Sequence, residues 1–183
     1  MAKLLHQKHA VAGAVHDEAS VTVVYTDGGC DLNKAGIGAW AFTAHFPDFT
    51  VIQRGSALLN TTNNRMEMRA VIKALEILEI GRPIRIVSDS MYVISGCTEW
   101  HFGWIKRGWK TADGQDVKNR DMWEPLLALC ELHAVEFKHV KGHAGNFQND
   151  HVDKACTKLM IDGHKLALAG QYVPLDMPVV AYA

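Results

Sequence analysis

Apolar residues along this chain recur with two spacings, one typical of strands and one typical of helices. Residues 21–25 form a run of β-branched side chains ending in Tyr25, which predicts a buried strand. Residues 64–80 instead contain good helix formers, and their apolar side chains from Val71 to Leu78 follow the i, i+3, i+4, i+7 spacing of a helix. The pattern therefore predicts a fold that combines strands and helices.

The same criteria, applied along the chain, predict the order βββαβααβα. The predicted strands lie at residues 21–25, 37–46, 50–58, 84–88 and 135–140. The predicted helices lie at residues 64–80, 90–105, 119–133 and 149–163, the second of them in pieces. Because no internal repeat or linker interrupts this order, we expect an α/β fold with a single mixed five-stranded sheet flanked by helices.

Length and composition fit one globular domain. The 183 residues suffice for a substantial core, and apolar and charged contents of 48% and 21% are ordinary. We expect residues 21–163 to form the domain, residues 1–20 to be a flexible extension, and residues 164–183 to be a tail that is irregular beyond Gln171. No segment approaches the roughly 20 apolar residues of a membrane span, and nothing in the sequence demands more than a monomer.

Cysteine usage indicates the redox compartment of the protein, and net charge limits how it could bind a polyanion. The four cysteines are scattered, with no Cys-x-x-Cys pair, which disfavours a zinc module or a disulfide framework and fits a reducing cytoplasm. The net charge of −1 gives no overall attraction to nucleic acid or membrane, so polyanion binding requires a local patch. Residues 100–120 offer such a patch, because lysines and arginines alternate there with tryptophans.

Three carboxylates occupy positions where a negative charge is unfavourable without a cation. Asp27 follows the first strand, which two glycines are expected to break, and Asp89 directly follows the fourth strand. Glu67 lies on the apolar stripe of its helix, in the first turn. A buried carboxylate needs a partner, and Mg²⁺ characteristically binds carboxylates together with substrate phosphates. We therefore predict a metal site, although Asp27 could also form a turn and Asp89 a helix cap.

Five segments extend this prediction to a known family. The segments TDGGC, TTNNRMEMRA, SDS, GWIKRGWKTADGQDVKN and VKGHAG occur in this order within residues 20–160, and together they resemble type 1 ribonuclease H with its basic protrusion. The resemblance implies hydrolysis of the RNA strand of RNA/DNA hybrids, leaving 5′-phosphate and 3′-hydroxyl ends. It also implies two Mg²⁺ ions, with Mn²⁺ as an alternative. The matching acids are Asp27, Glu67, Asp89 and Asp153, and His143 matches the histidine of the family's catalytic loop.

The resemblance further implies which residues contact the hybrid. Asn63 and Asn64 match positions in the minor groove, and Asn33 and Thr62 match positions near the bound strands. The protrusion, which grips the DNA strand in this family, supplies Trp100, Trp104, Lys106, Arg107, Trp109 and Lys110. Amide side chains both donate and accept hydrogen bonds, as recognition of a 2′-hydroxyl requires. Residues 61–64 could equally form a turn and a helix cap, and tryptophans at this spacing are often packing residues.

Two other functions stay open at this point. Integrases, transposases and junction resolvases have a similar acidic site and act on DNA, while a non-catalytic nucleic-acid-binding module could retain the fold. Asn63, Asn64 and the tryptophan-rich protrusion favour hybrids over duplex DNA. Retention of all four acids together with His143 disfavours a non-catalytic module.

Overall fold

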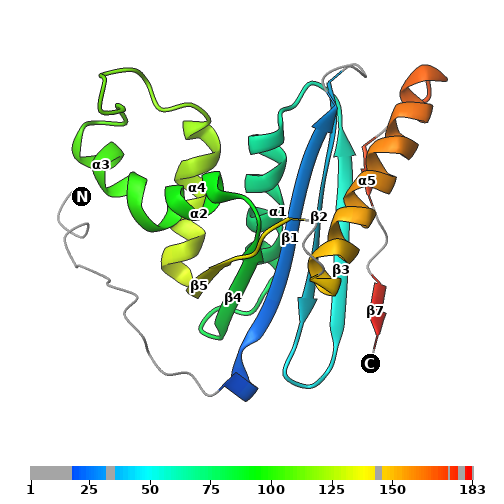
Figure 1. Ribbon diagram of the computed structural model, residues 1–183, viewed down its shortest axis with the longest axis horizontal. Helices are drawn as coiled ribbons and strands as arrows, with labels where there is room; N and C mark the ends of the chain where they lie inside the picture. The colour runs from blue at the N-terminus through cyan, green and yellow to red at the C-terminus, as the bar shows by residue number, and fades with distance from the viewer. Residues whose placement is uncertain (1–17, 32–35, 143–145, 173, 177–179, 183) are drawn as a thin grey trace.

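A mixed β-sheet forms the centre of the protein (Figure 1). The computed structural model describes residues 18–31, 36–142, 146–172, 174–176 and 180–182. The strands are β1 (Thr22–Asp31), β2 (Ile37–His45), β3 (Val51–Leu58), β4 (Pro83–Ser88), β5 (Ala134–His139), β6 (Leu175–Asp176) and β7 (Val180–Tyr182). Their order across the sheet is β5-β4-β1-β2-β3-β6, with β7 also paired to β3. Because β1 is antiparallel to β2 and parallel to β4, the predicted mixed sheet is confirmed, with its first five strands in the predicted sequence order.

The C-terminal tail differs from the prediction. We expected it to be irregular beyond Gln171, yet β6 and β7 both pair with β3 and extend the five-stranded sheet to seven strands. Without them β3 would be an edge strand, with a row of backbone N–H and C=O groups lacking strand partners. Pro174, which lies in this tail, comes just before β6 and so does not interrupt the pairing.

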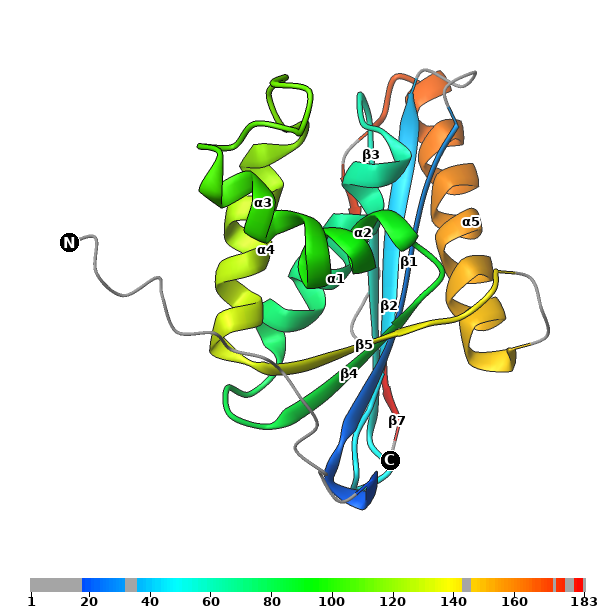
Figure 2. The same ribbon diagram turned by 60° about the vertical axis from the view of Figure 1, so that its left-hand side comes forward.

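Helices cover both faces of the sheet (Figures 1 and 2). They are α1 (Asn63–Ile77), α2 (Met91–Ser95), α3 (His101–Lys106), α4 (Arg120–Leu132) and α5 (Phe147–Leu168), with the short turns η1 (Glu18–Ser20) and η2 (Gly96–Trp100). Helices α1, α2 and α4 lie on one face and α5 on the other. The predicted helix in pieces over residues 90–105 is confirmed, because the π-helical turn η2 joins α2 to α3. Within the described segments, no helix is long and apolar enough to cross a membrane.

Helix α5 is longer than predicted at both ends. The predicted end at Gly163 is wrong, because this glycine lies inside the helix and faces the sheet. A Cβ at this position would come within 2.9 Å of Ala57 Cβ and 3.0 Å of Ile37 Cδ1. Gly163 therefore allows α5 to pack closely on the sheet, which explains the presence of a glycine inside the helix.

The sheet carries an apolar layer on each face. The larger layer lies between the sheet and α1, α2 and α4, and includes Val24, Phe42 and Trp123. The smaller layer lies under α5 and is built partly from small side chains such as Ala39 and Ala41 on β2. Small side chains let a helix approach a sheet closely. Helix α5 therefore lies close enough for Asp153, which it carries, to act electrostatically on Asp27 of β1.

Strand β1 continues through its two glycines, which corrects the prediction that they break it. Asp27 pairs with Ala41 of β2, and the ladder extends to Asp31. Gly28 faces α1, where a Cβ would overlap the backbone nitrogen of Glu67. The pairing of β1 with β4 reaches only to Tyr25, so Asp27 lies just past it, where the sheet opens between the two parallel strands. The glycine thus serves the close approach of α1 to β1 rather than a turn.

Candidate metal centre

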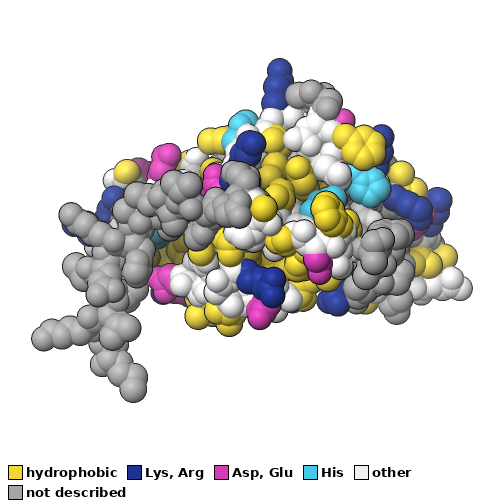
Figure 3. Space-filling model, turned by 90° about the horizontal axis from the view of Figure 1, so that it is seen from below, with side chains coloured by type: hydrophobic (Ala, Val, Ile, Leu, Met, Phe, Trp, Pro, Cys, Tyr) yellow, Lys and Arg dark blue, Asp and Glu magenta, His cyan; other side chains and the backbone are white. Residues whose placement is uncertain are grey.

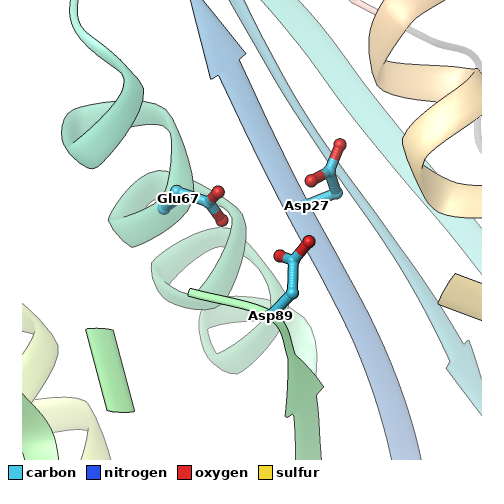
Figure 4. Close-up of side chains that lie close together, drawn as sticks. All are labelled: Asp27, Glu67 and Asp89. Atoms are coloured by element: carbon cyan, nitrogen blue, oxygen red, sulfur yellow. The ribbon is translucent and has the colours of Figure 1, made fainter. Parts of the chain in front are cut away.

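Three acidic side chains from separate segments converge beside β1 (Figure 4). Asp27 lies on β1, Glu67 on α1, and Asp89 directly after β4. One carboxylate oxygen from each residue lies within 4.8 Å of the other two. Among the residues that the structure describes, this is the one group of three or more such side chains close enough to share a metal ion.

Glu67 lies in the second turn of α1, not in the first turn as the sequence predicted. The helix begins earlier because Thr62 caps it, accepting a hydrogen bond from the Arg65 backbone nitrogen at 3.4 Å. Glu67 Oε2 is buried and has no hydrogen-bond partner among the described residues. Burial, reinforced by the charges of Asp27 and Asp89, raises the pKa of Glu67 well above its usual range.

Asp27 experiences the same conflict between burial and charge. Burial, followed by the nearby charges of Asp89 and Asp153, raises the pKa of Asp27 to about 6. Hydrogen bonds from the Cys156 thiol and the Gly28 backbone nitrogen act in the opposite direction. The carboxylates therefore repel one another when they are ionised at neutral pH, and a cation placed among them would relieve that repulsion.

The donor set fits a hard divalent cation. All three residues offer carboxylate oxygens, which suit Mg²⁺ and Mn²⁺ better than the sulfur and nitrogen ligands typical of zinc sites. The buried Oε2 of Glu67 provides a lone pair that no protein donor uses among the described residues. The raised pKa values of Asp27 and Glu67 indicate that the folded chain itself does not neutralise these charges.

The other two predicted catalytic residues, Asp153 and His143, are not part of this group of three carboxylates. Asp153 lies on α5 and raises the pKa of Asp27, but it is not part of the group within 4.8 Å. His143 lies outside the described residues, as does Asn33 among the predicted substrate contacts. The structure thus brings three of the four acids together and places the fourth within electrostatic reach of Asp27.

Cys156 is a neighbour of this site that the sequence did not single out. Its thiol donates to the backbone oxygen of Ala39 at 3.2 Å, and its interaction with Asp27 lowers the pKa of that carboxyl. The spacing of three residues from Asp153 places both side chains on one face of α5. The spacing of three residues from a predicted metal ligand could therefore have identified Cys156 from the sequence as a neighbour of the site.

The segment before α1 combines a cap with exposed amides. Thr62 and Asn64 are exposed. Thr62 is the N-cap of α1, which confirms the alternative prediction of a helix cap within residues 61–64. Asn63 Oδ1 accepts a hydrogen bond from the Cys30 backbone nitrogen at 2.6 Å. Because this bond fixes the amide orientation, the NH₂ group of Asn63 is the part that can face a ligand. The same residues can therefore cap a helix and present donors at the surface.

The protrusion, residues 100–120, is built on a cluster of tryptophans. Trp104 is only 8% exposed and packs against Trp100, Trp109 and Trp123, with ring centroids 5.9, 6.4 and 5.2 Å away. Trp100 is 41% exposed. The packing alternative therefore holds for Trp104, whereas Trp100 retains a surface that could contact a ligand.

The basic residues of the protrusion differ in how much of their charge is available. Lys106 and Arg107 are exposed, and Arg107 Nε donates to the Lys110 backbone oxygen at 3.1 Å. Lys110 pairs with Asp116 at 2.5 Å, which offsets part of its charge. The face seen from below in Figure 3 is not that of the protrusion, which lies at the top of Figure 1; lysine and arginine side chains on it are scattered rather than gathered into one patch. These observations make Lys106 and Arg107 the stronger candidates for a polyanion.

Comparison with known proteins gives a consistent family. A family model described as RNase H matches residues 19–160. The chain is 42% identical over 137 residues to a ribonuclease H from Acidithiobacillus ferrooxidans, covering 75% of this chain and 85% of that protein. It is 48% identical over 129 residues to a ribonuclease HI from Xylella fastidiosa, covering 70% of this chain and 85% of that protein.

Solved structures show the same fold. The crystal structure of LC9-RNase H1, described as a type 1 RNase H with the type 2 active-site motif, aligns with a TM-score of 0.67 at 28% identity, covering 88% of this chain and 80% of that chain. A foamy viral protease-reverse transcriptase in complex with an RNA/DNA hybrid aligns with a TM-score of 0.66 at 23% identity. That alignment covers 77% of this chain and 20% of the viral protein, and it concerns the fold alone.

Proposed function

Because this chain belongs to the ribonuclease H family and hydrolyses the RNA strand of RNA/DNA hybrids, we propose that its four acids hold two divalent ions at the cut phosphodiester. The ion is Mg²⁺ by preference, with Mn²⁺ as an alternative. The observation that carries this proposal is the convergence of Asp27, Glu67 and Asp89 within 4.8 Å, with raised pKa values at Asp27 and Glu67.

Each acid has a proposed place in this site. Asp27, Glu67 and Asp89 would hold one ion, and Asp27 together with Asp153 would hold the other. Two ions held there would supply an activated water, charge compensation on the phosphate, and stabilisation of the leaving oxygen. The RNA strand is then cut internally, with 5′-phosphate and 3′-hydroxyl ends.

His143 is proposed to handle a proton in this reaction. The residue follows Gly142, and an unperturbed imidazole has a pKa near ~6.5, so it can bind and release a proton near neutral pH. Its role is transfer of a proton at the cut phosphodiester or assistance to product release. The proposal for this residue rests on the family match, since it lies outside the described residues.

Selection of RNA is proposed to use the amides next to α1. The NH₂ group of Asn63 is available because Cys30 holds the oxygen of that amide, and Asn64 is exposed beside it. A 2′-hydroxyl in the wide minor groove of a hybrid can accept from such donors, whereas DNA has no such group. Thr62 contributes by capping the helix that carries both amides, and Asn33 is proposed to lie near the bound strands.

The protrusion is proposed to bind the DNA strand of the hybrid. Lys106 and Arg107 contact phosphates, Lys110 does so with part of its charge offset by Asp116, and exposed Trp100 packs against the strand. Trp104 and Trp109 support this surface from beneath through their mutual stacking. Most of the binding energy here is electrostatic and therefore depends on salt concentration.

The experiment that tests this function compares one sequence as an RNA/DNA hybrid, a DNA duplex and an RNA duplex, each with one labelled strand. We expect internal cuts in the RNA strand of the hybrid and none in its DNA strand or in the DNA duplex. End-group analysis should find 5′-phosphates and 3′-hydroxyls. Cleavage of the DNA duplex at a comparable rate would instead support an integrase-type nuclease, and binding of hybrid without turnover would support a non-catalytic module.

A further inference from the structure

Gly142 lies against the side chain of Asp89. Strand β5 runs beside β4 with His139 opposite Ser88, and the Val140 backbone nitrogen donates to the Ser88 oxygen at 3.1 Å. The chain after β5 therefore passes directly beside the residue that follows β4. A Cβ built on Gly142 would overlap Asp89 Oδ2 and would lie 3.4 Å from its Cγ.

The glycine is not needed for the backbone conformation. Gly142 is not among the described glycines with positive φ, so an alanine could adopt the same backbone angles. What the position requires is the absence of a side chain, because the Asp89 carboxylate fills the space that a Cβ would take. The requirement is therefore one of volume, and among the described residues the three nearest atoms that a Cβ would meet all belong to the Asp89 side chain.

The backbone around Asp89 is fixed on both sides. The Ser90 backbone nitrogen donates to Ser88 Oγ at 3.1 Å, and Ser90 caps α2 through a hydrogen bond from the Val93 nitrogen. Because this turn is held, a side chain added at Gly142 would be accommodated by rotation of the Asp89 carboxylate or by a shift of Gly142 itself. Rotation would move the carboxylate away from Asp27 and Glu67, toward which it points (Figure 4).

We propose that Gly142 is a positioning residue for the metal-binding carboxylate of Asp89, acting through the space that its missing side chain leaves. The inference rests on the proposed function, because it concerns how one of the proposed ligands is held. Residues that orient metal ligands typically alter metal affinity by about 10–100-fold when they are changed.

The test measures Mn²⁺ binding to the purified full chain by calorimetry, beside the Mg²⁺ dependence of hybrid cleavage. We expect Gly142→Ala to weaken Mn²⁺ binding about tenfold or more and to raise the Mg²⁺ concentration for half-maximal rate similarly. The matched control is Gly29→Ala on β1, because a Cβ there would meet only the flexible end of Met160, whose Cε lies 3.1 Å away. That control should bind Mn²⁺ like the unaltered protein.

A double variant separates action through Asp89 from a general disturbance of the turn. Asp89→Ala removes the overlapping carboxylate, so adding Gly142→Ala to it should change neither Mn²⁺ affinity nor melting temperature. If Gly142→Ala alone lowers the melting temperature, Asp89→Ala should restore it. Unchanged Mn²⁺ binding in Gly142→Ala, or equal losses with and without Asp89, would overturn the inference. Absence of Mn²⁺ binding in the unaltered protein would instead contradict the proposed function.

Discussion

At the scale of single residues, Asp27 is half-buried and has two acidic neighbours that raise its pKa. Its pKa of about 6 in the metal-free fold means that ionisation at neutral pH opposes folding. The same property favours cation binding, because a bound ion offsets the negative charge that the fold leaves uncompensated. The same uncompensated charge should therefore lower the stability of the metal-free protein at neutral pH and raise the affinity of the proposed site for cations.

Asp27→Asn should reveal this cost through its pH dependence. The unfolded chain has an Asp pKa near ~3.9, so between about pH 4 and pH 6 the folded state binds more protons. Stability of the metal-free unaltered protein should therefore fall as pH rises through this window. Above it, Asp27→Asn should be more stable by on the order of 1–3 kcal/mol, measured by urea unfolding in the presence of a chelator.

The control for this prediction is Asp162→Asn on α5. A hydrogen bond from Lys158 lowers the pKa of Asp162, so its removal should not stabilise the protein at neutral pH. A stability difference between Asp27→Asn and the unaltered protein that stays constant from pH 4 to pH 7 would contradict the assigned pKa shift.

What the sequence revealed about individual residues depended on whether their contacts are local. Asp89 could be placed after a strand and Glu67 on a helix stripe, because both positions follow from nearby residues. Their convergence with Asp27 depends on the pairing of β1 with β4 and on the close approach of α1 at Gly28. These long-range contacts leave no local pattern, so the sequence could suggest a cation for the acids from their positions, but it could bring the acids together in one site only through its resemblance to a family.

At the scale of elements, the protrusion couples a packed base to a basic surface. Trp104 anchors α3 by packing against Trp123 of α4, with ring centroids 5.2 Å apart. Lys106 and Arg107 follow at the end of the same helix and are exposed. Because the aromatic base holds this helix in place, substitution of the exposed charges should alter binding without altering the fold.

Charge reversal at Lys106 and Arg107 should weaken hybrid binding and reduce its salt dependence. Each lost phosphate contact should lower the slope of log affinity against log salt concentration by about one. The measurement is KM for hybrid cleavage over a range of salt concentrations. Lys158→Glu on α5, which pairs with Asp162 rather than lying on the protrusion, is the control. An unchanged salt slope in the Lys106 and Arg107 variant would show that other residues contact the phosphates.

Elements were predicted best where periodicity alone determines them. The strands at residues 37–46 and 84–88 and the start of the helix at residue 64 were found within one residue, whereas that helix ends at Ile77, three residues before its predicted end. Glycine misled the prediction at the end of β1, because Gly28 serves close packing there rather than a break. β6 and β7 were missed because such short strands form only where β3 offers an edge.

At the scale of the whole molecule, the site exists only when both layers are in place. Glu67 comes from α1 on one face of the sheet, Asp153 from α5 on the other, and Asp27 from the strand between them. The net charge of −1 provides no general attraction to nucleic acid, so on our proposal binding depends on the ions and the protrusion. The proposal therefore couples metal, substrate and fold through the same few carboxylates.

The most direct test of this account is the rate of Mg²⁺-dependent cleavage of a strand-labelled hybrid by the unaltered protein and by Asp27→Asn, with Asp162→Asn as the matched control. We predict that a chelator abolishes cutting of the RNA strand, that added Mg²⁺ restores it, and that Asp27→Asn stays folded but inactive at all Mg²⁺ concentrations. Near-normal cleavage by Asp27→Asn, or cleavage by the unaltered protein without divalent metal, would contradict the proposed metal site.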